Sequence, residues 1–203
     1  MQFSEAAQAL ATLAQRFYDR GWLMGTSGNL SAVVQREPLQ VAITASGQDK
    51  SGLGAEQIVL VDKGARACGG NGSPSAETLL HLAVIEARGA GAVLHTHSIW
   101  STTLSEKMAG RGAVTIDGFE MLKGLAGVRS HEHSESLPIL ENSQDMAALA
   151  RRVKQTLAEQ PGIHGFLLRR HGLYTWGRDL PEAKRHVEVL EFLLEAVGRL
   201  MIV

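Results

Sequence analysis

The connections between several expected strands are very short, and this feature constrains the fold most. Residues 30–34 and 39–44 are both strand-like, and only four residues, including a proline, separate them. The apolar runs 165–170 and 173–176 are separated by two residues. Because a parallel pair needs a crossover of a dozen or more residues, both pairs must be antiparallel. The sequence therefore predicts a mixed or mainly antiparallel sheet.

Helical patterns alternate with the strands along the chain. Five amphipathic helices are expected, at 4–20, 75–87, from Ser98, at 145–158 and from Pro181 onward. Further strands are expected at 58–61, 92–97, 113–116 and 137–140, a short helix at 119–125, and a Gly- and Ser-rich surface loop at 64–74. These elements predict one sheet covered by helices.

Length, charge and composition limit the class of protein. A chain of 203 residues with 44% hydrophobic residues suits a single globular domain over residues 1–203. The net charge of −1 gives no electrostatic reason to expect a nucleic-acid or membrane partner. Cys68 is the only cysteine, and the first residues carry several charges and no signal-peptide core. We expect a cytoplasmic protein.

Two histidines one residue apart point to a metal site. His95 and His97 end an apolar run, and a strand would direct both imidazoles to one face and Thr96 to the other. His171 also ends an apolar run. Three imidazoles with an open fourth position are typical of a catalytic zinc site. The alternative is that the His95 and His97 pair is merely packed or solvated.

Three loops rich in glycine or serine form a second candidate site. They lie at 25–29, 45–47 and 73–75, and none has the spacing of a Walker loop or a dinucleotide fingerprint. Such loops offer backbone N–H groups and small hydroxyls to an anion. Each alone reads as a turn, whereas three beside a candidate metal site predict a phosphate cradle.

Several short blocks, taken in order, resemble the class II aldolase and adducin family. They are GTSGNLS (25–31), SG (46–47), PSAE (74–77) with His81, HTHS (95–98) and RHG (170–172). The resemblance implies α/β/α layers around a mainly antiparallel central sheet and one Zn²⁺ held by His95, His97 and His171. It also implies a phosphorylated keto-sugar substrate and a cyclic homotetramer with active sites at subunit interfaces.

Three further blocks are similar to one branch of this family. They are GFEMLKG (118–124), LPILEN (137–142) and RRHGLYTWG (169–177). That branch removes water from a methylthio-substituted pentulose phosphate in methionine salvage, so the resemblance implies a lyase. We also expect the chain to lack the tyrosine-bearing tail of the family's aldolases.

The resemblance assigns roles to particular residues. Glu120 is expected to move protons during water loss, and Glu77 is the competing candidate. From the residues alone, Glu120 reads as a surface glutamate and Glu77 as an ion-pair partner of His81. The expected phosphate contacts are Asn29, Ser46, Gly47 and Ser75.

Two other functions stay open on the sequence. One is a zinc-dependent aldolase or epimerase that acts on another ketose phosphate. The other is a metal-free interaction module of the adducin type, which the complete three-histidine set disfavours. Among the remaining histidines, His131 and His133 are expected in a polar loop and His164 in a structural role. His186 is expected on the outer side of the last helix's apolar stripe.

Overall fold

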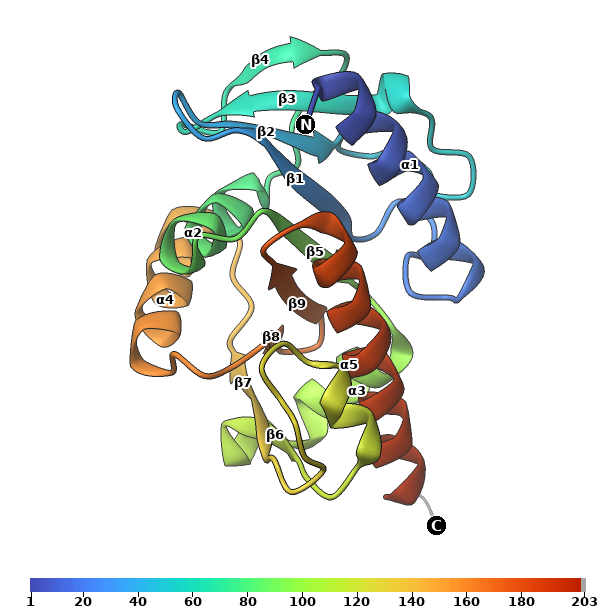
Figure 1. The fold of residues 1–203 in the computed structure, drawn as a ribbon, viewed down its shortest axis with the longest axis vertical. Coiled ribbons are helices and arrows are strands. Elements are labelled where there is room, and N and C mark those ends of the chain that lie inside the picture. Colours follow the sequence, from blue (N-terminus) through green and yellow to red (C-terminus); the bar gives the residue numbers. More distant parts are fainter. Residues whose placement is uncertain (202–203) are drawn as a thin grey trace.

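The computed structural model describes residues 1–201, and a single sheet runs through the described chain (Figure 1). Its strand order is β4-β3-β2-β1-β5-β9-β8-β7-β6. Every neighbouring pair is antiparallel except β7 and β8, which are parallel. The strands are β1 Asn29–Gln35, β2 Gln40–Thr44, β3 Ile58–Asp62, β4 Ala67–Gly70, β5 Ala92–Thr96, β6 Ala113–Ile116, β7 Glu135–Leu140, β8 Gly165–Leu168 and β9 Gly172–Gly177.

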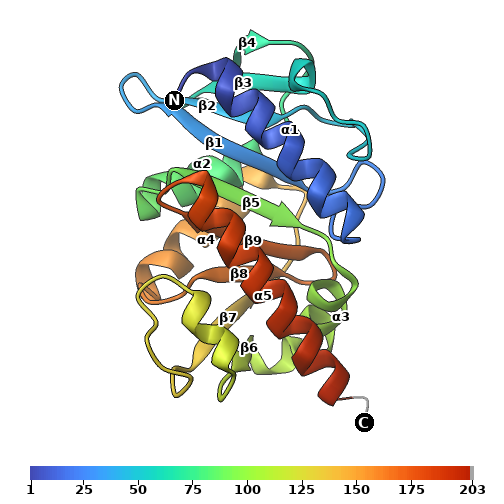
Figure 2. The ribbon, with the colours of Figure 1, turned by 45° about the vertical axis from the view of Figure 1, so that its right-hand side comes forward.

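Helices cover both faces of the sheet (Figure 2). Helices α1, α3 and α5 pack on one face, and α2 and α4 pack together on the other. Each face is closed by apolar side chains that the helices and strands bury between them. The bounds are α1 Phe3–Asp19, α2 Thr78–Arg88, α3 Ile99–Lys107, α4 Met146–Glu159 and α5 Leu180–Leu200, with 3-10 turns η1 Ala55–Gln57, η2 Ala109–Arg111 and η3 Glu120–Gly124. The expected α/β/α layers and mainly antiparallel sheet are confirmed.

The segment expected to be a loop at 64–74 contains an edge strand, so that expectation was wrong. Strand β4 pairs with β3, but three of its four residues are exposed. An edge strand that buries no apolar face leaves no alternating pattern in the sequence. Helix α2 also begins three residues after Ser75, because Ser75 instead accepts bonds that close the preceding turn.

The central strands bring distant parts of the chain to one point. Strand β5 lies between β1 and β9, and His95 is opposite Asn29 on one side and Tyr174 on the other. The end of β5 and the start of β9 therefore meet beside the loop that precedes β1. Within residues 1–201, no helix is both long and apolar enough to cross a membrane.

Gly172 permits this meeting, and replacing it is expected to destabilise the fold. An added Cβ would lie 2.0 Å from the Thr96 carbonyl oxygen and 3.2 Å from Cε1 of His95. We expect Gly172→Ala to lower the free energy of unfolding by about 3 kcal/mol, the upper range for overpacking a close-packed site. Urea unfolding measures this change. Gly162→Ala is the matched control, because no atom lies within 4 Å of its added Cβ. Equal stability of the two variants would contradict the prediction.

Candidate active site

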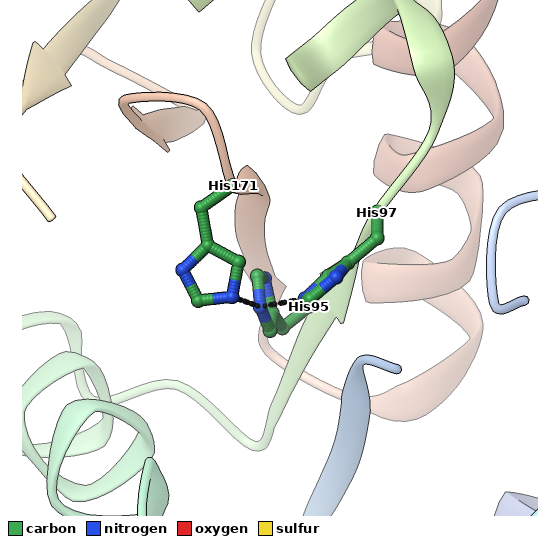
Figure 3. A group of neighbouring side chains, drawn as sticks. All are labelled: His95, His97 and His171. Carbon is green, nitrogen blue, oxygen red and sulfur yellow. Dashed lines mark hydrogen bonds between the residues drawn. The ribbon is translucent and has the colours of Figure 1, made fainter. Parts of the chain in front are cut away.

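Three histidine side chains converge at the end of β5 (Figure 3). His95 is in β5, His97 follows its last residue, and His171 lies in the turn between β8 and β9. The Nε2 atom of His95 is 2.7 Å from Nε2 of His97 and 3.4 Å from Nε2 of His171. The structure thus brings together all three of the expected metal ligands.

Neighbouring groups fix the orientation of the central ring. His95 is fully buried, and its Nδ1 donates to the Leu173 carbonyl oxygen at 2.9 Å, so Nε2 carries the free lone pair. The ring stacks on Tyr174 with centroids 3.9 Å apart. Thr96 points to the other face of the strand, where it donates to Glu191. A backbone acceptor on the far nitrogen is the usual support of a metal-binding histidine.

Burial keeps the three rings uncharged at neutral pH. It lowers the pKa of His97 to about 4 and holds the pKa of His95 well below its usual value. Burial also lowers the pKa of His171, against the opposing charge of Glu77. Metal ions bind the neutral imidazole. Three neutral nitrogen donors a few ångströms apart therefore fit a metal ion.

Glu77 lies directly against the three histidines. Its Oε1 is 3.3 Å from Nε2 of His171, and its Oε2 is 3.6 Å from Nε2 of His95. The expected ion pair of Glu77 with His81 is not what holds it. Instead, the side-chain amide nitrogen of Asn29 donates to Glu77 at 2.6 Å, and the side-chain oxygen of Asn29 contacts Nε2 of His81. Burial lowers the pKa of His81 to about 3. Asn29 therefore links the two residues.

A cavity of about 270 Å³ opens beside the histidines. Four residues expected to contact phosphate lie in its lining, namely Asn29, Ser46, Gly47 and Ser75. The hydroxyl oxygen of Ser75 accepts from the Asn29 amide and from the Glu77 backbone N–H, both at 3.2 Å. Its own proton is not used in these bonds, so it can be donated to a ligand.

Lys50 is a residue of this cavity that the sequence did not indicate. Its side chain is only 1% exposed, and Nζ donates to the carbonyl oxygens of Gln48 at 2.8 Å and Thr26 at 3.3 Å. Burial lowers the pKa of this amine. A lone lysine in a polar segment reads as a solvated surface residue, and only the folding of two distant loops over it makes it part of a site.

Glu120 is not brought to the histidines within one chain. It begins η3, its side chain is 72% exposed, and it accepts from Lys123 at 2.6 Å. The hydrogen bond from Lys123 lowers the pKa of the Glu120 carboxyl. Glu120 is absent from the lining of the cavity beside the histidines.

The expectation for His186 was wrong, since this side chain is buried. Its Nδ1 donates to the Trp176 carbonyl oxygen at 2.7 Å, and its Nε2 accepts from the Ala126 N–H at 3.0 Å. The loop at 125–130 covers this side of α5. A helix position alone does not show that a segment 60 residues earlier packs on it.

Known proteins are similar to this chain in sequence and in architecture. Residues 8–197 match the family described as "Class II Aldolase and Adducin N-terminal domain". The chain is 40% identical to the methylthioribulose-1-phosphate dehydratase of Marinobacter nauticus, over 96% of this chain and 93% of the relative. It is 42% identical to the protein of the same name from Pectobacterium carotovorum, over 95% of this chain and 94% of the relative.

Solved structures agree with the fold. An L-fuculose 1-phosphate aldolase superimposes with a TM-score of 0.78 at 22% identity, over 97% of this chain and 86% of that one. The L-fuculose-1-phosphate aldolase of Thermus thermophilus gives 0.75 at 21% identity, over 98% and 95%. The profile match covers nearly the whole chain, and the relatives are similar over nearly their whole length. The chain therefore belongs to the class II aldolase and adducin family.

Proposed function

We propose that this protein dehydrates 5-methylthioribulose 1-phosphate to 2,3-diketo-5-methylthiopentyl 1-phosphate, a step of methionine salvage. The observation that carries the proposal is the 40–42% identity, over at least 95% of this chain, to relatives named methylthioribulose-1-phosphate dehydratase. The three converging histidines beside a polar cavity support it, because they supply a metal site next to a place for a small anionic substrate.

We further propose Zn²⁺ as the metal, one ion per subunit, held by His95, His97 and His171. When bound, a zinc ion supplies a Lewis acid for the ketone oxygen of such a substrate. The donor set supports this assignment, because three neutral imidazoles and an open position are the pattern of catalytic zinc sites. Glu77, which lies against two of the rings, keeps them close together and is available for proton transfer.

The substrate's phosphate is proposed to bind at the Ser46, Gly47 and Ser75 end of the cavity. Gly47 has a φ of +70°, which allows the backbone to turn there without strain. The Ser75 hydroxyl has a proton to donate, and the buried Lys50 ammonium adds a positive charge to the same lining. Asn29 already uses its amide on Glu77 and Ser75, so its main part is to position these residues.

Proton transfer is assigned to Glu120 of a neighbouring subunit. In this role Glu120 takes the proton from C3 and gives one to the hydroxyl that leaves C4. Glu120 lies outside the cavity of its own chain, so this role requires a site across an interface. The surface near it combines charged groups with exposed apolar side chains. Met121 is 39% exposed and Phe192 is 50% exposed, and both line a hollow together with Trp22. Covering such a surface favours an assembly of identical chains.

We propose that this assembly is a homotetramer of single-domain subunits, each spanning residues 1–203, in the cytoplasm. The net charge of −1 and the polar, small-ligand site give no reason to invoke a nucleic-acid or membrane partner. The partners are then other copies of this chain and one sugar-phosphate substrate.

The test is to incubate the zinc-loaded protein with 5-methylthioribulose 1-phosphate and follow the diketone by its ultraviolet absorbance. We expect the diketone to form, and His171→Ala to give none. Release of a three-carbon ketone phosphate and a methylthio aldehyde would instead show an aldolase. A protein that neither binds metal nor changes the substrate would be an interaction module of the adducin type.

A further inference from the structure

A second group of side chains has the donor atoms of a metal site. It lies where β7 and β8 begin, at the opposite end of β8 from His171. One ring nitrogen each of His133 and His164 and one carboxylate oxygen of Glu135 lie within 4.8 Å of one another. We propose that these three residues bind a divalent transition-metal ion of the Zn²⁺ type, separate from the ion of the three-histidine site. Two nitrogen donors and one carboxylate are a common set for such ions, whereas Mg²⁺ and Ca²⁺ prefer oxygen alone.

The topology explains why these residues meet. Glu135 is the first residue of β7, and His164 directly precedes β8. These strands are parallel neighbours, so they begin side by side. His133 lies two residues before Glu135, the same spacing that places His95 and His97 on one face. Both sites therefore combine a His-x-ligand pair at the end of one strand with a histidine that directly precedes another strand.

The distances are as compact as those of the three-histidine site. The Oε2 atom of Glu135 is 2.9 Å from Nε2 of His133 and 2.8 Å from Nδ1 of His164. In the three-histidine site the closest pair of ring nitrogens is 2.7 Å apart. Donor atoms around a tetrahedral zinc ion are about 3.3 Å apart, from Zn–N bonds of about 2.0 Å. The third pair of donor atoms, from the rings of His133 and His164, lies within 4.8 Å, so all three donors are near the spacing that a metal ion requires.

The supporting hydrogen bonds aim the donor atoms at one point. Both ring nitrogens of His164 donate, Nε2 to the Ala126 carbonyl oxygen and Nδ1 to Oε2 of Glu135, each at 2.8 Å. A metal ion bound here takes the place of the Nδ1 proton, while the bond to Ala126 holds the ring in position. The other carboxylate oxygen, Oε1, accepts from the His164 backbone N–H at 2.8 Å, which leaves Oε2 for a metal. Backbone partners of this kind orient the ligands of metal sites. His186 is not part of the group, because its ring nitrogens bond to backbone atoms of Trp176 and Ala126 and not to Glu135.

A cavity connects this group to solvent. Its volume is about 840 Å³, and both His133 and His164 lie in its lining. Glu135 is only 1% exposed, whereas the side chain of His133 is 33% exposed. Arginine and glutamate side chains also line the cavity, among them Arg88, Arg129 and Glu132, so the open position of the ion would face a polar chamber that admits water. Zinc can therefore enter without unfolding of the chain.

The test is to titrate the metal-free full-length protein with Zn²⁺ in competition with a chromophoric chelator. We expect two equivalents per chain for the wild type. His133→Gln should weaken one equivalent at least tenfold, about the loss that follows removal of even an indirect metal partner. His133 is chosen because its removal leaves the buried pair of Glu135 and His164 intact, and thermal unfolding checks that the variant is folded.

Two variants make the result specific. His131→Gln is the matched control, an exposed histidine of the same loop that is not in the group, and it should keep both equivalents. His171→Ala should lose the other equivalent and leave the second site alone. In that variant, bound Co²⁺ should show the visible absorption of a four-coordinate nitrogen and oxygen site. One equivalent in the wild type, or a second equivalent that His133→Gln leaves unchanged, would overturn the proposal.

Discussion

His97→Ala and His171→Ala are each expected to lose the bound metal of the three-histidine site and to reduce dehydratase activity to background. Each ring supplies one of three nitrogen donors that converge within a few ångströms. Removing one leaves two donors, which cannot hold the ion or its open position in place. Metal content by atomic spectroscopy and diketone formation measure the two effects on the same sample.

His95→Ala should also lose metal and activity. It should destabilise the fold as well, so its loss of activity must be distinguished from unfolding. His95 is fully buried and stacks on Tyr174, so its removal also leaves a cavity in the sheet. The other two variants avoid this complication because their rings are partly exposed. Lys63→Ala, which changes an exposed residue of the turn between β3 and β4, serves as the control. Full occupancy of the three-histidine site in all three variants would contradict the assignment.

Glu120→Gln is expected to lower activity by roughly two to four orders of magnitude, the usual contribution of general acid–base catalysis. The amide keeps the shape of the side chain but cannot accept a proton, so the substrate should still bind. Glu132→Gln, a neighbouring exposed glutamate, is the matched control and should change little. Steady-state kinetics separate the loss of kcat from any change in KM.

Because Glu120 lies on the surface, mixing two inactive variants tests whether active sites are shared between subunits. A chain with Glu120→Gln keeps its histidines, and a chain with His171→Ala keeps its Glu120. If active sites are shared between subunits, mixed oligomers of two inactive variants should regain activity in about a quarter of their sites, as random pairing in a closed ring requires. No recovery in oligomers shown to be mixed would place Glu120 outside the neighbouring site.

Proton exchange distinguishes Glu120 from Glu77. Exchange of the C3 proton with solvent reports proton abstraction apart from water loss. Glu77→Gln should retain more exchange, because Glu77 mainly holds the positions of Asn29 and the histidines. If Glu120→Gln exchanges at the wild-type rate while Glu77→Gln does not, the two roles must be swapped.

The parts of the site that follow from local spacing could be predicted from the sequence. His95 and His97 share a face because a strand alternates its side chains, and this needs no knowledge of the rest of the fold. His171 could be predicted as a metal ligand from its local sequence as well, since it ends an apolar run next to a glycine. The antiparallel layers followed from connections too short for crossovers.

The parts that depend on packing between distant segments could not be predicted. The burial of Lys50 requires two loops to close over it, and the burial of His186 requires the loop at 125–130 to cover α5. Strand β4 is held by backbone bonds to β3 and leaves no side-chain pattern. The role proposed for Glu120 requires a neighbouring subunit, which no pattern within one chain describes.

Because His95 lies between two antiparallel partner strands, the chain must fold before this site can bind a metal ion. His95 and His171 are 76 residues apart in the chain, and they meet only after β9 has paired with β5. Such long-range pairing is slow to form during folding. An ion that needs both rings therefore finds no preformed site in the nascent or unfolded chain. It acts by stabilising the native state after folding, so loss of metal from the finished protein should leave a folded apoprotein ready to be reloaded.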